Sequence, residues 1–248
     1  RNVKFFRIDK LKQIRVIDPE AHIERILSQV KLDLKLNKSP YHIECFDNSN
    51  LMGTNPVGSC VVFKNAKPSK KDYRLYRIND ISGPDDFASM EQVVYRRLKR
   101  LVKEKNSLPD LIIVDGGKGQ LSSGLKSLVK LGVEDKVAII GIAKKLEEIF
   151  IPGDKLPLYI NKTSETLKLI QQLRNEAHRF AINFHRKKRS KHAFESQIDN
   201  LTGIGPKTSE LLLNKFQSFK RIQRASEKDL IELLGKVRGK SLFKQLKS

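Results

Sequence analysis

Three short strand-like runs follow one another closely in the first third of the chain, and they constrain its fold more than any other feature. They cover residues 41–47 (YHIECFD), 57–63 (VGSCVVF) and 73–78 (YRLYRI). Segments rich in Gly, Pro, Asn and Lys separate them, which is typical of turns between paired strands. The pattern therefore predicts three antiparallel strands joined in sequence order.

Helices and strands alternate after these three runs. The sequence predicts a helix at 83–105, a strand at 110–115, a helix at 119–132, a strand at 137–143, a hairpin at 148–160 and a long helix from about Thr163. Alternation of this kind indicates strands added in parallel. Three antiparallel strands followed by helices and strands in alternation is the order of a ribonuclease-H-like α/β domain, with a mixed sheet and flanking helices.

The rest of the chain divides around this domain. Residues 18–35 have apolar side chains at helical spacing after an Asp-Pro start, so residues 1–36 are interpreted as an opening helix segment and 37–190 as the α/β domain. The apolar period breaks in RKKRSKHAFES, which predicts a linker at 191–196. Residues 197–248 then form a smaller all-α domain.

The charge of the chain points to a polyanion as its partner. Lys and Arg number 49 against 28 Asp and Glu, so the formal net charge is +21. A charge of this size and sign favours nucleic acid. No run of 18 apolar residues and no signal-peptide pattern occurs, so we expect no membrane partner and a cytoplasmic location. Cys45 and Cys60 lack the spacing of metal ligands and are interpreted as reduced core residues.

Two aspartates are candidates for a metal site. Asp47 ends the first strand of the antiparallel set, and Asp115 ends the strand at 110–115. If these strands are neighbours, the two carboxylates lie side by side and require a cation between them. Mg²⁺ or Mn²⁺ suits such oxygen ligands and would support phosphodiester hydrolysis. The alternative is that each aspartate only forms a turn at the end of its strand.

A histidine on the long helix is the third candidate. His178 lies in NEAHRFAINFHRKK and could ligate a metal, activate water or protonate a leaving oxygen. Arg179, Arg186 and Lys187 follow it and could bind phosphates. The alternative is a hydrogen-bonded histidine of the partial core.

Two further segments lie next to these candidates. Asp85 and Asp86 are interpreted as helix-capping residues, although Asp86 could reach the site as an additional carboxylate. GGKGQ lacks the spacing of a nucleotide-triphosphate loop, so ATP is not an expected ligand. Its glycines and Lys118 would suit a DNA phosphate instead.

The C-terminal domain contains a helix-hairpin-helix pattern. In LTGIGPKTSELLLNKF, Gly203 and Gly205 would let the backbone approach a phosphate, with Lys207 beside them. A weaker second copy, LGKVRGKSLFKQL, contains Gly235, Gly239 and Lys240. Paired hairpins of this kind would grip duplex DNA through its backbone. The alternative for each copy is a glycine-rich turn between helices.

Residues 41–248 resemble the C-terminal half of bacterial UvrC, the nuclease subunit of the UvrABC nucleotide-excision-repair system. The resemblance depends on six motifs in the order and spacing of that family: IECFDNSN, GPDDFASMEQVVYRR, PDLIIVDGGKGQL, GIAKK, NEAHRFAINFHR and LTGIGPK. It implies a ribonuclease-H-like endonuclease domain with a tandem helix-hairpin-helix domain, which cuts damaged duplex DNA on the 5′ side of a lesion with a divalent metal.

Carried over by position, the resemblance makes Asp47, Asp115 and His178 the catalytic and metal-binding set, with Asp86 as an additional acid. Asn175 departs from the family, which usually has an acidic residue there, and this predicts weakened metal affinity. UvrB is an expected partner through a segment outside this chain. Two other functions stay open: a DNA-binding module without activity, and a ribonuclease H that cleaves RNA.

Overall fold

The computed structural model of the chain describes residues 18–49, 56–78, 85–143, 147–198 and 201–247. The first part of the predicted opening segment, residues 1–17, therefore lies outside the described residues. The chain divides into two compact units between Ile182 and Asn183. No helix in the described ranges has both the length and the apolar character needed to cross a membrane.

A mixed seven-stranded sheet forms the first unit, as the order of the runs predicts. Its strands are β1 (His42–Ser49), β2 (Val57–Lys64), β3 (Lys67–Pro68), β4 (Arg74–Arg77), β5 (Leu111–Asp115), β6 (Ala138–Ile142) and β7 (Ile149–Phe150). The order across the sheet is β3-β2-β1-β5-β6-β7, and β4 pairs with the same strand, β2, as β3 does. The pairs β1–β2 and β2–β4 are antiparallel, while β1–β5 and β5–β6 are parallel. The predicted antiparallel set and its parallel additions are confirmed.

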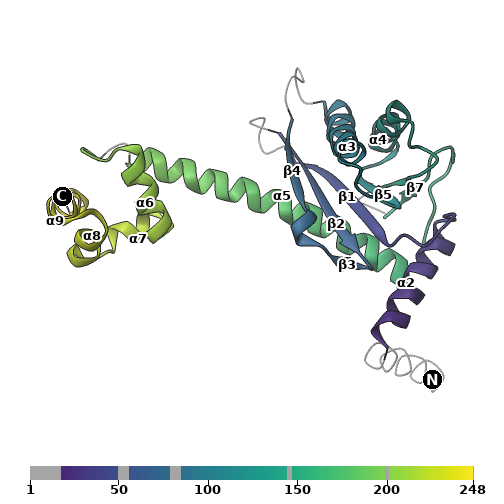
Figure 1. Cartoon of the computed structure of the whole chain (residues 1–248), viewed down its shortest axis with the longest axis horizontal. Coiled ribbons are helices and arrows are strands. Elements are labelled where there is room, and N and C mark those ends of the chain that lie inside the picture. The colour runs from purple at the N-terminus through teal and green to yellow at the C-terminus, as the bar shows by residue number, and fades with distance from the viewer. Residues whose placement is uncertain (1–17, 50–55, 79–84, 144–146, 199–200, 248) are drawn as a thin grey trace. The chain divides into compact units, whose positions relative to one another are not determined.

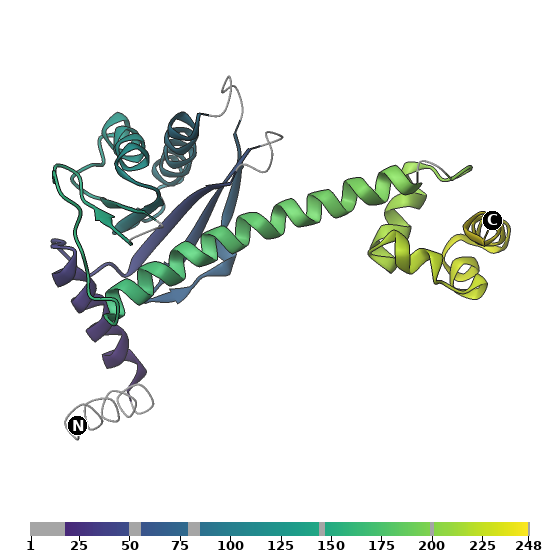
Figure 2. The ribbon, with the colours of Figure 1, turned by 180° about the vertical axis from the view of Figure 1, so that it is seen from behind.

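Helices cover both faces of this sheet (Figure 1). Two of them, α3 (Asp86–Lys103) and α4 (Lys118–Leu131), lie side by side on one face. The first part of α5 (Glu165–Ile198) crosses the other face, which Figure 2 shows from behind. The helix α2 (Pro19–Asp33) is joined to α5 by an ion pair between Arg25 and Glu165. A short 3-10 helix, η1 (Lys70–Asp72), precedes β4.

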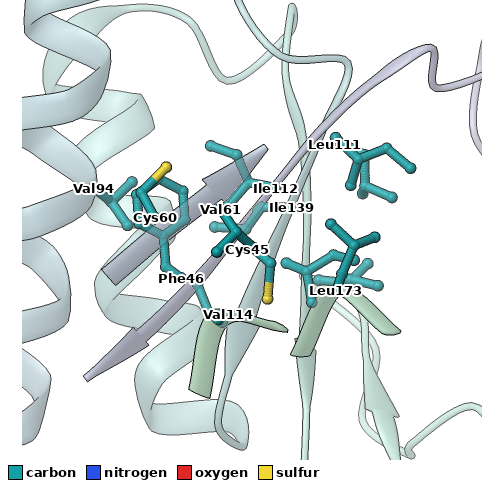
Figure 3. Packing of buried hydrophobic residues seen from close by; sticks show 14 of the residues in the cluster. Cys45, Phe46, Cys60, Val61, Val94, Leu111, Ile112, Val114, Ile139 and Leu173 are labelled. Atoms are coloured by element: carbon teal, nitrogen blue, oxygen red, sulfur yellow. The ribbon is translucent and has the colours of Figure 1, made fainter. Parts of the chain in front are cut away.

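Side chains of β1 alternate between the two faces of the sheet, as strand geometry requires. Glu44 contacts Arg97 of α3, whereas Asp47 contacts His178 of α5. Figure 3 shows the apolar packing around this strand, with Cys45 and Cys60 among the buried side chains. Both cysteines are free and fully buried, and burial raises the pKa of each thiol well above its usual value. The prediction that they are core residues is confirmed.

The second unit is all helical. It contains the end of α5 and the helices α6 (Pro206–Phe216), α7 (Phe219–Gln223), α8 (Glu227–Leu234) and α9 (Lys236–Lys247). Among the side chains of this unit that the structure describes, the apolar residues buried in its core are Phe194, Ile198, Leu212, Ile222, Leu230 and Leu242.

The prediction of a linker at 191–196 is wrong, because α5 continues through these residues to Ile198. Phe194 and Ile198 are four residues apart on one face of the helix, and this apolar face packs into the core of the second unit. The basic residues that precede them hide this short apolar repeat in the sequence.

Candidate active site

Asp115 ends β5, and Asp47 lies beside it on the parallel neighbour β1, two residues before that strand ends at Ser49 rather than at the strand end that the sequence predicted. In the ladder between β1 and β5, Cys45 pairs with Ile113 and Phe46 with Val114, so the two aspartates follow at the next position of each strand. Asp47 is buried, with 3% of its surface exposed, and Oδ2 of Asp115 is shielded from solvent. A site with two carboxylates requires that these two strands be neighbours, and the structure pairs them directly.

His178 of α5 lies against the first of these carboxylates. Its Nδ1 is 3.0 Å from Oδ2 of Asp47, while 48% of the histidine side chain is exposed. An ionised carboxylate only accepts hydrogen bonds, so Asp47 places the imidazole proton on Nδ1. The second ring nitrogen, Nε2, is then left for a reacting group.

Ser59, which was not predicted from the sequence, positions the helix that carries this histidine. Ser59 is paired directly with Asp47 between β1 and β2, and it is fully buried. Its hydroxyl donates a hydrogen bond of 3.0 Å to the carbonyl of Ala177, the residue before His178. A lone hydroxyl in the otherwise apolar run VGSCVVF was the signal that could have identified it.

The start of α3 lies near the end of β1. Asp85 caps the helix, since its carboxylate accepts hydrogen bonds from the backbone N–H groups of Phe87 and Ala88. The capping prediction is thus confirmed for Asp85. Asp86 is exposed in the first turn, and its carbonyl accepts a hydrogen bond from the side chain of Asn48. The backbone of Asp86, the third acidic candidate, is therefore joined to the residue that follows Asp47.

A buried ion pair lies on the opposite face of β1, three residues before Asp47. Arg97 donates to both carboxylate oxygens of Glu44, with its Nη2 2.5 Å from Oε1. His42 makes a further contact of 3.1 Å. Burial alone would raise the pKa of the Glu44 carboxyl, but its hydrogen bonds to His42 and Arg97 hold that pKa below the usual value. This pair was not predicted from the sequence, although an acid inside an apolar strand was a signal for it.

Comparison with known proteins decides the family of the chain. A family model described as the UvrC RNAse H endonuclease domain matches residues 31–182. The chain belongs to the UvrC family. It is 61% identical over 235 residues to the UvrABC system protein C of Christiangramia forsetii. This match covers 95% of the present chain and 39% of that protein. The protein of the same name from Porphyromonas gingivalis is 52% identical, with 100% of this chain and 41% of that protein covered.

The chain thus spans about 40% of the length of these UvrC relatives. Among solved structures, the endonuclease V from Bacillus subtilis is similar with a TM-score of 0.34 and 16% identity, covering 64% of this chain and 91% of that one. The ribonuclease-H-like sheet and the endonuclease domain expected from the UvrC motifs are confirmed by the family match and by the strand order.

The three-residue metal shell expected from the UvrC resemblance differs from the structure. Within the described ranges, no group of three or more His, Cys, Asp or Glu residues is placed to hold a metal ion. His178 instead turns its Nδ1 to Asp47 and forms a hydrogen bond with it. The two adjacent carboxylates still fit Mg²⁺ or Mn²⁺, because such ions are commonly held by one or two carboxylates, water and substrate phosphates.

Asn175, the departure from the UvrC pattern, does not take part in the contact with Asp47. Its amide oxygen accepts from Arg174, with distances of 3.3 and 3.4 Å to two guanidinium nitrogens. The following residue, Glu176, accepts two hydrogen bonds of 2.6 Å from Arg179 and one of 3.2 Å from Tyr73. Arg179, expected to bind phosphate, is therefore already paired with a carboxylate on its own helix.

The other predicted phosphate ligands lie in different places. Lys118 begins α4 just after Asp115, and its Nζ donates a 2.5 Å hydrogen bond to the carbonyl of Lys155. Arg186 is exposed on α5. The side chain of Lys187 lies outside the described residues.

The predicted hairpins occupy the second unit. Gly203 has a φ of 77°, and Gly205 is the N-cap of α6 without a side-chain cap. Pro206 has no N–H, so Lys207 and Thr208 carry the first backbone N–H groups of that helix. Lys207 follows in the first turn and is exposed. This arrangement agrees with the first hairpin predicted from the sequence.

The second hairpin differs in part from its prediction. Gly235, with a φ of 82°, ends α8 directly before α9, and Lys240 is exposed on α9. Gly239 is buried inside α9, and a Cβ there would lie 2.5 Å from the Cα of Ile231. Its small size therefore serves the close packing of α9 on α8, which corrects the expectation that it contacts DNA.

Proposed function

We propose that this chain is a divalent-metal-dependent DNA endonuclease that makes the 5′ incision in nucleotide excision repair. The observation that supports it best is the convergence of Asp47, Asp115 and His178 at one edge of the sheet. Two adjacent carboxylates with a histidine bonded to one of them supply the groups that phosphodiester hydrolysis requires: ligands for a hard cation and a proton carrier.

Asp47 and Asp115 would hold the metal, which when bound neutralises phosphate charge and lowers the pKa of water. Asp47 has a second task, because it holds His178 in the tautomer with the proton on Nδ1. Nε2 of this half-exposed histidine then accepts a proton from the attacking water or, when protonated, donates one to the leaving oxygen. Asp86, exposed near the same strand end, is an additional acid that could contact water at the site.

DNA would be held by both units. In the second unit, Gly203, Gly205 and Lys207 present open backbone N–H groups and a positive charge to a phosphate. Gly235 and Lys240 form the second, less regular contact. In the first unit, Lys118 and the free side of the Arg179 guanidinium would take the backbone near the scissile phosphate, and Arg186 and Lys187 would add positive charge along α5.

Damaged duplex DNA and UvrB are the partners that this function requires. The relatives are named as proteins of the UvrABC system, and they are longer than this chain. We propose that a segment outside the present chain makes the contact with UvrB. Lesion recognition is assigned to the assembled system as well, since none of the motifs in this chain reads base chemistry.

Nicking of supercoiled plasmid tests the proposal. The wild type should nick in Mn²⁺ or Mg²⁺ and stop in excess chelator, whereas Asp47→Ala should lose activity and keep its DNA affinity within a few-fold. Asp135→Ala is the matched control, because Asp135 is an exposed aspartate in a turn of the same unit. Equal nicking by Asp47→Ala would exclude Asp47 from the reaction. DNA binding without nicking by any variant, with UvrB and the rest of the UvrC protein supplied, would favour a binding module.

A further inference from the structure

Phe87 is an exposed aromatic residue that the proposed reaction does not use. It is the second residue of α3, and 52% of its surface is accessible. The other strongly exposed aromatic residues in the described ranges are Tyr41 and Tyr159, and the hydroxyl of each is bound to a glutamate. The side chain of Phe87 has no polar atom, so hydrogen bonding does not explain why its ring is exposed to solvent.

The ring lies at the same end of the sheet as the two carboxylates. Phe87 directly follows Asp86, whose carbonyl is bound by the side chain of Asn48, the residue after Asp47. On its other side the ring lies against the first turn of α4, which begins three residues after Asp115. The side chain thus lies between the starts of two helices, each of which is close to one of the strand-end aspartates.

Gly119 of α4 makes room for the ring. A Cβ added to Gly119 would lie 2.2 Å from Cε1 and 2.7 Å from Cζ of Phe87. The ring is therefore in contact with the backbone of α4 along one edge, while about half of the residue remains accessible. An aromatic ring held in this way by a neighbouring helix is a rigid platform rather than a freely rotating side chain.

We propose that Phe87 stacks on an unpaired nucleobase of the DNA strand whose phosphate lies at Asp47 and Asp115. The inference rests on the proposed function, which brings a nucleic acid strand to this edge of the sheet. Bases have an apolar face that any aromatic ring can cover, and such stacking is insensitive to sequence. A base that leaves its stack near the cut is then held by the protein, and the backbone next to it becomes accessible.

A base is a better occupant for this ring than an apolar protein segment. The chain carries a net charge of +21, and Lys118 lies next to Gly119 at the same helix start. This edge of the sheet combines three features. Two carboxylates are ligands for a cation, a lysine is a contact for phosphate, and an exposed ring is a surface for a base. Single-stranded nucleic acid requires this combination of stacking and positive charge.

Binding without cleavage tests the platform. Affinities of the full chain would be measured by fluorescence anisotropy in EDTA for two duplexes that contain the same short unpaired stretch. One duplex carries normal bases in that stretch, and the other carries abasic residues. Stacking of one base corresponds to about a five- to 150-fold difference in affinity. We expect the wild type to prefer the duplex with bases by at least about fivefold.

Four variants separate stacking from packing. Phe87→Tyr should keep the preference, whereas Phe87→Leu, which is apolar but has no aromatic face, should reduce it to about onefold. Gly119→Ala should lower it as well, because the new methyl group displaces the ring while alanine favours the helix. Val102→Ala is the matched control, since Val102 is an exposed apolar residue (46%) near the other end of α3. Thermal melting would verify that all variants are folded.

The outcomes distinguish this proposal from the proposed function. A wild type that nicks plasmid but binds both duplexes equally would overturn the stacking role and leave the endonuclease intact. Equal preference in wild type and Phe87→Leu would overturn it too, and would favour a protein partner for the exposed ring. A preference that depends on Phe87 in a chain that does not nick would support the platform and count against the nuclease.

Discussion

Nδ1 of His178 lies 3.0 Å from Oδ2 of Asp47, although the two residues are 131 positions apart in the chain. The contact joins the last part of β1 to the middle of α5, and it gives Asp47 a role in holding the histidine. The same relationship appears in active sites where a carboxylate orients an imidazole and leaves its second nitrogen for the reaction.

Two substitutions of His178 separate these roles. Asparagine places an amide nitrogen near the position of Nδ1 and can keep the bond to Asp47, but it has no counterpart of Nε2. If Nε2 transfers a proton, His178→Asn should lower the nicking rate by about 10²- to 10⁴-fold, as His178→Ala does, with DNA affinity unchanged. A rate for His178→Asn close to the wild type would show that the histidine only orients Asp47. The rates would be measured across pH. A variant that lacks the proton carrier should also lose the part of the pH–rate profile that depends on protonation of that group.

Ser59→Ala tests the hydroxyl that holds α5. Loss of its bond to the carbonyl of Ala177 should cost about 1 kcal/mol of stability and lower the nicking rate, because His178 is the next residue. Ser89→Ala is a suitable control, since Ser89 is also buried but its hydroxyl bonds within its own helix. Urea denaturation and plasmid nicking would be compared. Equal effects of both substitutions on nicking would show that Ser59 has no special link to the site.

The ion pair between Glu44 and Arg97 should be costly to break from one side. Glu44→Gln leaves a buried guanidinium without its counter-charge, which typically costs about 3–5 kcal/mol. The double variant Glu44→Met with Arg97→Met removes both charges and should recover much of that loss. Urea denaturation followed by circular dichroism, with amide exchange of β1, measures both effects. A double variant as unstable as the single one would show that the pair stabilises the fold directly.

Acid stability should depend on the same carboxyl. Because the pKa of Glu44 is lower in the folded chain than in the unfolded one, its contribution is complete above the unfolded value of about 4.5. That contribution is lost as the pH falls through the lower folded pKa. Stability of the wild type should therefore fall more steeply below about pH 4 than that of Glu44→Gln. Parallel curves for the two proteins would contradict this assignment.

Gly205 and Gly239 should respond to alanine in opposite ways. Gly205 has an extended backbone with a φ of −86° and open space around a Cβ, so Gly205→Ala should fold normally. If the hairpin backbone approaches a phosphate there, the same change should weaken DNA binding several-fold. Gly239→Ala should instead destabilise the second unit, because its Cβ would meet the backbone of α8. Thermal melting and DNA titration of both variants check this, and unchanged affinity in Gly205→Ala would argue against the hairpin contact.

Salt dependence gives a second test of the hairpin. Each phosphate contacted contributes about 0.9 to the slope of log affinity against log salt. Lys207→Ala should reduce that slope by about this amount, whereas Lys215→Ala, at the other end of α6, should leave it unchanged. A slope that is the same in both variants would remove Lys207 from the DNA contact.

The sequence by itself determined the elements and their order. Strand periods, glycine- and proline-rich turns and an aspartate cap indicated β1, β2, β4, β5, β6, α3 and α4, because these signals are local and depend only on neighbouring residues. The two-residue strand β3 lies in a segment that was interpreted as a turn. The same signals placed Asp115 at the end of its strand and Asp47 near the end of its own, which continues to Ser49. The helical course of residues 191–196 was missed because basic side chains surround Phe194, and the apolar face of that helix is recognisable only when its core partners are in place.

Only the tertiary structure decided which side chains meet. The bond from Asp47 to His178, the hydroxyl of Ser59 under α5 and the pairing of Glu44 with Arg97 all join residues that are distant in the chain. Gly239 was a DNA-binding candidate in the sequence, and only the structure shows that it packs against α8. The physical reason is that strand alternation and helix packing assign each side chain to a face and a neighbour, and both depend on the assembled sheet rather than on local sequence.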